Sequence, residues 1–390
     1  MSHLEQLVAP GGSAQRAAPA EAPLADGFSV RPWPDALGPV LDAHWDRLAA
    51  SCAVPNPFYE RWYLTPSFRH FDPGGEVRLA TLVVGGNLVA LMPLARKPRY
   101  YGLFLPHLTN WQHPNIFCGE PLVVAEHADA FARALLGWCD SNPQQALFLS
   151  LSGLPRDGLA FDAISTAAGR DGRSARMVQA IERAALHRGP TPQEHLRQAL
   201  ERKRRKELQR KRRRLEEAGT LVFSRQSDAT DLTPWIDEFL TLEASSWKGE
   251  QGSALASAPA TEALFRESLE GAARAGKLER LAFHLDGRPV AMLSSFLSGP
   301  QGFGFKTAYA ADLAKLSPGM LLQVENLAIL EHDDIVMSDS CAAPDHPMIG
   351  QIWPDRREIA LLSVAIGGAL RRAVGAGLIA LEIYRTQRRQ

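Results

Sequence analysis

The sequence predicts an α/β (α+β) fold made of two similar halves, each with a mixed central sheet that contains an antiparallel hairpin and is flanked by helices. The main observation is a pattern that occurs twice, about two hundred residues apart: RLATLVVGGNLVALMPLA from Arg78 and RLAFHLDGRPVAMLSSFL from Arg280. Each copy has two apolar runs around a glycine-containing turn, which is typical of a tight β-hairpin. Both copies occupy similar places in halves of similar size, as expected for a duplicated domain.

Length and composition limit the class of protein. The 390 residues suffice for two domains with their own cores, and the 45% hydrophobic content is that of a globular chain. The formal net charge is zero, so any attraction to nucleic acid or to an anionic membrane has to be local. Four widely spaced cysteines, no C-x-x-C pair and no signal-peptide pattern favour a reducing cytoplasm. No apolar run reaches the length of a membrane span.

The order of patterns predicts a tail and two domains. Residues 1–26 are rich in Ala, Pro, Gly and Ser without a period, which predicts a disordered tail. Residues 27–190 form the first predicted domain, and residues 191–390 the second. The elements expected in the first domain are a strand near Phe28, a helix over 39–51, the first hairpin, an aromatic loop over 100–117, a helix over 128–140 and a strand over 146–151.

The second domain begins with a strong helix-start signal. Thr191 can serve as the N-cap, Pro192 takes the first helical position, and Glu194 completes a capping box. We expect this helix to run to about Ala218 and to end at Gly219.

This helix contains eleven basic residues within 197–214 and a thin apolar stripe that can seat it on a domain. Such a charge run is typical of a solvated face. Binding of an anionic ligand or of lipid headgroups at the inner membrane surface is an alternative. Nucleic acid is not expected as a partner, because zinc ligands, an RRM aromatic pattern and heptads are absent from the sequence.

A possible phosphate site follows the second hairpin. A strand is expected from about Gly302, and then a helix whose N-cap would be Ser317, with Pro318 at the first helical position. Gly319 leaves the amides of the first turn uncovered, so a phosphate or pyrophosphate could bind there. Ordinary helix capping is the alternative.

The order of these motifs is similar to that of a known family. The basic helix KRRKELQRKRRRLEE before Gly219, the second hairpin, the FKTAY strand, the SPGMLL helix start and the 339–353 segment resemble the CelD-type acetyltransferase domain of the GNAT superfamily, a relative of the Fem peptidyltransferases. The resemblance covers about residues 190–390, and the first half resembles a second GNAT-like domain more weakly. It implies acyl transfer from a CoA thioester to an amine, with the thioester between two splayed strands and no permanently bound cofactor.

One motif fits the family pattern in the wrong context. Arg372, Gly375 and Gly377 match the R-x-x-G-x-G pyrophosphate pattern, but the segment is expected to follow a helix and to precede a strand. One of these glycines is therefore expected to be a C-cap. We instead assign donor binding to the SPG segment, with the residues Lys306, Ser317, Gly319 and Met320; acyl carrier protein or another acyl carrier remains open as donor.

The reaction needs a base, oxyanion donors and stabilisation of the thiolate, but no covalent nucleophile. His346 is the leading candidate base, since it titrates near neutrality, and Asp345 and Asp339 lie near it in sequence. Tyr309 could protonate the thiolate. Cys341 is interpreted as an unreactive buried cysteine rather than an acyl carrier.

The acceptor is expected to bind at the domain interface. The predicted contacts come from the aromatic loop and from the second half: Trp111, His113, Asn115, Glu325, Trp353 and Arg357. His107 and His113 lack a third ligand at metal-binding spacing, so no metal is expected.

The leading hypothesis is an acyl-CoA N-acyltransferase. Bacterial ceramide synthases are similar to this wider GNAT group, so the resemblance, the apolar loop and the basic helix suggest long-chain acyl transfer to a sphingoid base. Three alternatives remain open: a Fem-like enzyme using aminoacyl-tRNA, an acetyltransferase of polysaccharide biosynthesis, and a non-catalytic CoA-binding protein.

Overall fold

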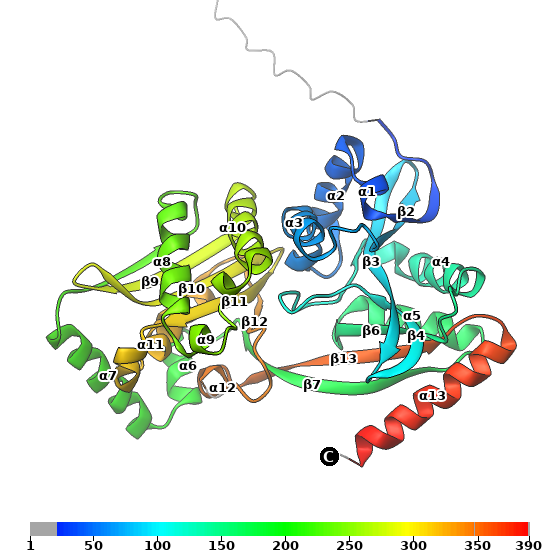
Figure 1. Cartoon of the computed structure of the whole chain (residues 1–390). Coiled ribbons are helices and arrows are strands. Elements are labelled where there is room, and N and C mark those ends of the chain that lie inside the picture. The colour runs from blue at the N-terminus through cyan, green and yellow to red at the C-terminus, as the bar shows by residue number, and fades with distance from the viewer. Residues whose placement is uncertain (1–21, 347, 389–390) are drawn as a thin grey trace, which may run out of the picture.

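The computed structural model describes residues 22–346 and 348–388 (Figure 1). Most of the predicted tail, residues 1–21, lies outside the described residues. Two lobes face each other in Figure 1, and the long strands β7 (Ala175–His187) and β13 (Asp355–Ala365) run along their lower side from one lobe toward the other.

The described strands form one 13-stranded mixed sheet with the order β1-β2-β3-β4-β6-β13-β7-β12-β11-β10-β9-β8, and β5 pairs with β3. The remaining strands of the first half are β1 (Gly27–Pro32), β2 (Arg78–Val84), β3 (Asn87–Tyr100), β4 (Leu103–Asn110), β5 (Leu122–Val123) and β6 (Phe148–Pro155). Those of the second half are β8 (Leu221–Gln226), β9 (Leu278–Leu285), β10 (Arg288–Ser298), β11 (Gln301–Tyr309) and β12 (Met337–Asp339).

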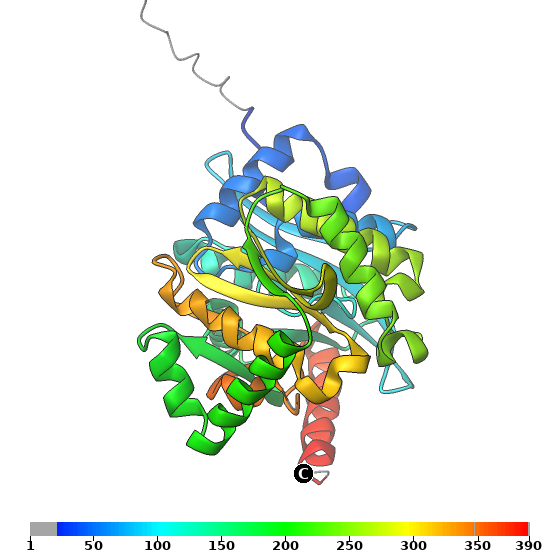
Figure 2. The same cartoon turned by 90° about the vertical axis from the view of Figure 1, so that its left-hand side faces the viewer.

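Helices flank this sheet, and Figure 2 gives a second view of their arrangement. In the first half they are α1 (Trp33–Ala36), α2 (Pro39–Ser51), α3 (Arg61–Phe71), α4 (Ala128–Ser141) and α5 (Leu159–Arg170). In the second half they are α6 (Pro192–Ala199), α7 (Arg202–Glu217), α8 (Leu232–Ala244), α9 (Trp247–Glu250), α10 (Pro259–Arg274), α11 (Pro318–Asn326), α12 (Ile349–Ile352) and α13 (Ala369–Gln387). The predicted fold class, a mixed sheet with antiparallel hairpins flanked by helices, is confirmed.

Both predicted hairpins are present. β2 pairs with β3 and β9 pairs with β10, in each case antiparallel. The two central turn residues have positive φ in both copies, 59° and 75° at Gly85 and Gly86, 50° and 79° at Asp286 and Gly287. Glycine and aspartate tolerate positive φ, so these turn residues allowed both hairpins to be predicted from the sequence.

The division of the chain at residue 190 stays a prediction. β13, from the end of the chain, pairs with β6 on one side and with β7 on the other, so it lies among strands of the first half. β7 joins the two parts of the sheet, because its other edge pairs with β12. Lys277 and Glu60, on opposite sides of the division, form an ion pair of 2.6 Å next to the contact between α3 and α10.

The basic helix is interrupted, which corrects the expectation of one continuous helix. The capping box of Thr191 and Glu194 is present, but α6 ends where Leu200 turns to an extended conformation (φ −123°, ψ 135°) and a new helix, α7, begins. The Arg205 guanidinium donates hydrogen bonds to the carbonyls of Arg197 and Leu200. These bonds satisfy carbonyls that the end of α6 leaves free, so the break is stabilised locally.

Two further expectations were wrong. The expected aromatic loop over 100–117 contains a strand, β4, which pairs with β3. The segment around Gly375 and Gly377 follows β13 and lies inside the continuous helix α13, so neither glycine is a C-cap. A Cβ on Gly375 would lie 2.4 Å from the carbonyl oxygen of Leu147, so this glycine allows α13 to approach the backbone just before β6. Within the described part of the chain, no helix is both long and apolar enough to cross a membrane.

Candidate active site

The candidate site lies where two parallel strands separate. β11 pairs with β12 only over three positions, Gln301–Phe303 with Met337–Asp339. A Cβ on Gly304 would lie 2.6 Å from the carbonyl oxygen of Ser340, so the two chains touch once more before they part. Beyond this point β11 continues to Tyr309, and a bulge against Ser294 and Ser295 of β10 bends it. A cavity of about 660 Å³ opens between β11 and the segment after β12.

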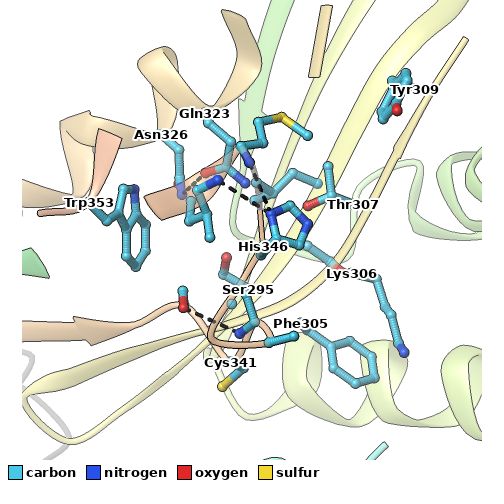
Figure 3. A pocket seen from close by; sticks show the side chains of 18 of the residues that line it. Ser295, Phe305, Lys306, Thr307, Tyr309, Gln323, Asn326, Cys341, His346 and Trp353 are labelled. Carbon is cyan, nitrogen blue, oxygen red and sulfur yellow. Dashed lines mark hydrogen bonds between the residues drawn. The ribbon is translucent and has the colours of Figure 1, made fainter. Parts of the chain in front are cut away.

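The cavity lining includes polar groups without partners in the described part of the chain. Three buried groups that line it have no hydrogen-bond partner among the described residues: Oγ of Ser294, Oδ1 of Asn326 and Nε1 of Trp353. Asn326 also donates to Oε1 of Gln323 at 3.3 Å, and both side chains come from α11 (Figure 3). Because buried polar groups are normally paired, these atoms are available to a polar ligand.

His346 lines the cavity from the segment after β12 (Figure 3). Its Nδ1 accepts the backbone N–H groups of Met348 and Ile349, both at 3.4 Å. The proton of the neutral ring then lies on Nε2. Loss of solvent around the ring, and secondarily the charge of Lys248, lowers the pKa of His346, so the imidazole is neutral at pH 7. Asp345 also lines the cavity.

Lys306, in the second half of the chain, connects the cavity to Asn115 of the first half. Its Nζ donates a 2.7 Å hydrogen bond to Oδ1 of Asn115 and lies 5.3 Å and 5.4 Å from the ring centroids of Phe117 and Phe305. Burial is the main cause that lowers the pKa of Lys306 to about 8, and Lys248 adds to it. Lys306 therefore gives up its proton more readily than an ordinary lysine.

A smaller hollow of about 240 Å³ adjoins the cavity at the start of α11, lined in part by Ser317, Gly319 and Met320. Tyr309 and Met348 line both spaces. The expectation that the Ser317 side chain caps α11 was wrong: the residue has φ 53°, and its Oγ accepts a 2.8 Å hydrogen bond from Lys211 of α7. The amides of the first turn therefore receive no cap from this serine.

Two of the predicted site residues lie beside the cavity in a buried ion-pair cluster. Asp339, 1% exposed, lies 3.5 Å from Arg183 and 3.4 Å from Arg357, and accepts the N–H of Cys341 at 2.8 Å. Arg357 also pairs with Asp157 at 3.1 Å. Neither Asp339 nor Arg357 is part of the cavity lining. Through the ion pairs with Arg183 and Arg357, Asp339 links β12 to its neighbour β7 and to β13 on the far side of β7.

The aromatic residues of the first half pack in the core rather than around the cavity. The His113 ring stacks on Phe71 at 4.1 Å, and burial lowers the pKa of His113 to about 3. Trp111 is buried and packs on Phe68 and His113. Glu325 points to α7, where it pairs with Arg212.

The structure thus brings together most of the predicted residues. Those that line the cavity or the adjoining hollow are Lys306, Tyr309, Ser317, Gly319, Met320, Asp345, His346 and Trp353. Asn115 reaches the site through Lys306, whereas Trp111, His113, Glu325, Asp339 and Arg357 do not line it. No group of three or more His, Cys, Asp or Glu side chains that could hold a metal occurs in the described ranges.

Sequence reasoning missed several lining residues, among them Trp247, Lys248, Ser294 and Asn326. A signal for Asn326 existed: Gln323 and Asn326 are three apart in α11, so they share one helix face, and both side chains are buried. A polar pair on a buried helix face is worth testing as a ligand contact.

The comparisons with known proteins agree with this fold. Residues 202–336 match the family model of the acetyltransferase (GNAT) domain, about a third of the chain. No curated protein matches the sequence.

Among solved structures, FemX has a TM-score of 0.50 at 10% identity, covering 82% of this chain and 95% of its own. The C-terminal domain of a putative lysylphosphatidylglycerol synthetase from Agrobacterium fabrum has a TM-score of 0.52 at 11% identity, with coverages of 87% and 95%. A conserved protein of unknown function from Bacteroides thetaiotaomicron has a TM-score of 0.54 at 9% identity, covering 83% of this chain and 97% of its own. At these identities the likeness concerns the fold. The domain match supports an acyltransferase, and the residues that match the GNAT acetyltransferase model lie in the second half of the chain.

Proposed function

We propose that this protein transfers an acyl group from a CoA thioester to an amine by direct attack, within the cavity between β11 and the segment after β12. The observation that carries the proposal is the separation of these two parallel strands beside the uncapped start of α11. An acyl-CoA whose thioester lies in this gap would place the CoA diphosphate near the N-terminus of α11, where backbone N–H groups and the helix dipole favour anions.

The donor site is supported by the residues around the smaller hollow. Ser317, Gly319 and Met320 line it, and Lys211 is held beside it by its hydrogen bond to Ser317. A Cβ on Gly319 would lie 3.0 Å from Cδ1 of Tyr309, so glycine keeps the start of α11 against this ring. The phosphates would bind here, and the thioester would reach the larger cavity past Tyr309.

The chemistry needs few groups. The amine nitrogen attacks the thioester carbonyl, a C–N bond forms, and the C–S bond breaks as the tetrahedral intermediate collapses. His346 takes the proton of the amine, directly or through one water; this requires the tautomer in which Nε2 is free, so the two long contacts of Nδ1 are given up. Tyr309 gives a proton to the leaving thiolate and regains one from solvent.

A covalent acyl-enzyme is not part of the proposal. Cys341 lines the cavity, but burial and the nearby Asp339 carboxylate raise its thiol pKa well above the ordinary value. A thiol that stays protonated is a weak nucleophile. Direct transfer from the thioester to the amine is therefore the simpler route.

For the acceptor we propose an amphiphilic amine, with a sphingoid base and a long-chain acyl donor as the specific candidates. Apolar side chains such as Trp247, Leu293 and Phe305 line much of the cavity, and Asn326 and Trp353 add polar atoms that are unpaired among the described residues. Neither the family match nor the structural neighbours identify a substrate. Placement in the cytoplasm and contact of the basic segment 197–214 with the inner membrane surface belong to the same proposal.

Transfer from an aminoacyl-tRNA is the second candidate. Six exposed cations of α7 have no ion-pair or hydrogen-bond partner among the described residues: Arg202, Lys203, Lys206, Arg210, Arg213 and Arg214. At 100° per residue they fall within one third of the helix circumference, on the side away from the buried Leu208 and Leu215. This helix contacts α11 through Lys211 and Arg212, so a polyanionic carrier could bind next to the site.

The experiment that tests the proposal is release of free CoA thiol from acetyl-CoA and from palmitoyl-CoA, each offered with sphinganine and with a panel of polar amines. Acceptor-dependent release establishes the reaction, and preference for palmitoyl-CoA with sphinganine supports the amphiphilic substrates. If folded protein releases no thiol with any pair, but modifies an amine in the presence of aminoacyl-tRNA, the second candidate replaces the first.

A further inference from the structure

The tip of the β3–β4 hairpin exposes large apolar side chains. Tyr101, Leu103 and Phe104 are 68%, 53% and 72% exposed. Tyr101 and Gly102 are the central residues of the turn, with φ of 47° and 80°. Asparagine, aspartate or glycine would suit this turn better than tyrosine, so turn formation does not account for the aromatic residue.

A second apolar surface runs along α13. Leu370, Val374, Leu381 and Tyr384 are all exposed, Leu370 by 81%. At 100° per residue these four positions fall within about 80° of the helix circumference, so they form one stripe. The buried positions of α13, Gly375 and Ile379, face the sheet.

A groove joins the two surfaces. It has a volume of about 730 Å³ and is lined by Tyr101, Leu103 and Leu105 from the hairpin and by Leu378 and Leu381 from α13. Tyr100 donates a 2.6 Å hydrogen bond to Glu382, which fixes the hairpin to the helix. We call the exposed residues Tyr101, Leu103, Phe104, Leu381 and Tyr384 together the hairpin–helix surface.

Cations surround this surface. Lys97 and Arg99 of β3 and Arg385 and Arg388 beside the stripe are exposed. Residues 96–105 contain no acid, and α13 contains one, Glu382, whose carboxylate accepts the Tyr100 hydrogen bond. The hairpin–helix surface is therefore apolar at its centre and positive at its rim.

The positive rim of the hairpin–helix surface distinguishes between two possible occupants, a second copy of the chain and an anionic lipid bilayer. If a second copy of the chain covered this surface symmetrically, its cations would face the same cations of the first copy, and like charges across an interface cost affinity. An anionic lipid bilayer instead offers phosphates to the rim and hydrocarbon to the centre. Aromatic residues such as Tyr101 and Phe104 suit the boundary between the two.

We propose that the hairpin–helix surface binds peripherally to an anionic lipid bilayer, with the hairpin tip and the α13 stripe entering the boundary between headgroups and acyl chains. α13 lies at the lower end of the molecule in both Figure 1 and Figure 2, and so does α7 with its six unpaired cations. The proposal does not depend on the donor or the acceptor of the transfer reaction.

The test is flotation of the full chain with vesicles of phosphatidylcholine, with and without phosphatidylglycerol. We expect binding only to the vesicles that contain phosphatidylglycerol, and weaker binding at high salt. Phe104→Ser and Leu381→Ser should each lower the partition coefficient about tenfold, because each removes a large apolar contact with the bilayer. Val222→Ser, at an exposed position of β8, is the matched control and should bind like the native chain.

A charge pair of variants completes the test. Lys97→Glu together with Arg99→Glu should weaken binding to anionic vesicles, whereas Arg274→Glu, a change of an exposed arginine on α10, should have little effect. Thermal unfolding by circular dichroism confirms that each variant is folded. The proposal fails if the native chain does not float with anionic vesicles, or if Phe104→Ser and Leu381→Ser bind like Val222→Ser. It also fails if Leu381→Ser only abolishes self-association measured by light scattering.

Discussion

At the scale of single residues, the proposed role of His346 as the catalytic base can be tested directly by substitution. This side chain lines the cavity, is neutral at pH 7, and its two nitrogens serve different ends: Nδ1 accepts backbone amides, and Nε2 either donates or, in the other tautomer, accepts. The proposed mechanism uses it as an acceptor of the amine proton. A histidine that only donates would stabilise the oxyanion or the thiolate instead.

Two substitutions separate these roles. His346→Ala should lower kcat/KM roughly 10²–10⁴-fold, and His346→Gln should lower it by as much, because glutamine can donate but cannot take a proton. Substantial activity in His346→Gln would contradict the base role. In the native enzyme, activity should fall on acidification only below about pH 6.5, the ordinary histidine pKa, since the pKa of His346 is lowered. The pH profile of kcat/KM measures this limb.

Glu120 is a buried titratable residue outside the cavity, and it makes stability depend on pH. Its Oε1 accepts the N–H of Ala160 at 2.8 Å, while Oε2 has no partner among the described residues. Burial raises the pKa of Glu120 to about 7. The folded state therefore binds a proton more tightly than the unfolded chain, so this group favours folding below its unfolded pKa and loses that contribution as pH rises to about 7.

Glu120→Gln should remove this dependence, because glutamine resembles the protonated acid at every pH. We expect the variant to be more stable than the native chain at pH 8 by on the order of 1–3 kcal/mol, with a smaller difference at pH 5. Urea unfolding at the two pH values measures the change. Equal stability differences at both values would show that Glu120 titrates normally.

At the scale of elements, α13 offers a matched pair of glycines. Gly375 lies against the Leu147 carbonyl, whereas a Cβ on Gly377 would meet nothing within 4 Å. Gly375→Ala should therefore destabilise the fold by roughly 1–3 kcal/mol through overpacking. Gly377→Ala should stabilise it by about 0.5–1 kcal/mol, since alanine is the better residue in a helix interior.

Thermal or urea unfolding of both variants checks this difference. A loss of stability in Gly377→Ala would indicate a non-helical backbone there, as the C-cap interpretation of the sequence required. Such a result would also revive the pyrophosphate motif of Arg372, Gly375 and Gly377, which the continuous helix excludes because its interior amides are bonded within the helix.

At the scale of the whole molecule, the sequence predicted what local chemistry determines. The two hairpins follow from their turn residues, the start of α6 from its capping box, and the start of α11 from the Ser317–Gly319 segment. The break at Leu200 was not predictable from helix signals, since it depends on an arginine one turn further along the chain.

Long-range pairing accounts for most of the remaining errors. β13 lies between β6 and β7, more than 150 residues away from either, and a pattern of apolar residues does not specify such partners. For the same reason Trp111 and His113 resembled pocket residues in the sequence but are core residues in the fold. Asn115 was expected at the interface between the two halves. Its hydrogen bond with Lys306 does join the two halves at the cavity.

The most direct test of the central claim is hydrogen exchange of the native chain with and without a non-hydrolysable thioether analogue of acyl-CoA. The account predicts slower exchange in three segments: 304–309 of β11, 318–321 at the start of α11, and 340–346 after β12. These segments enclose the cavity and the adjoining hollow. Binding of the analogue with protection confined to other segments, or with no protection at all, would contradict the assignment of the cavity as the acyl-CoA site.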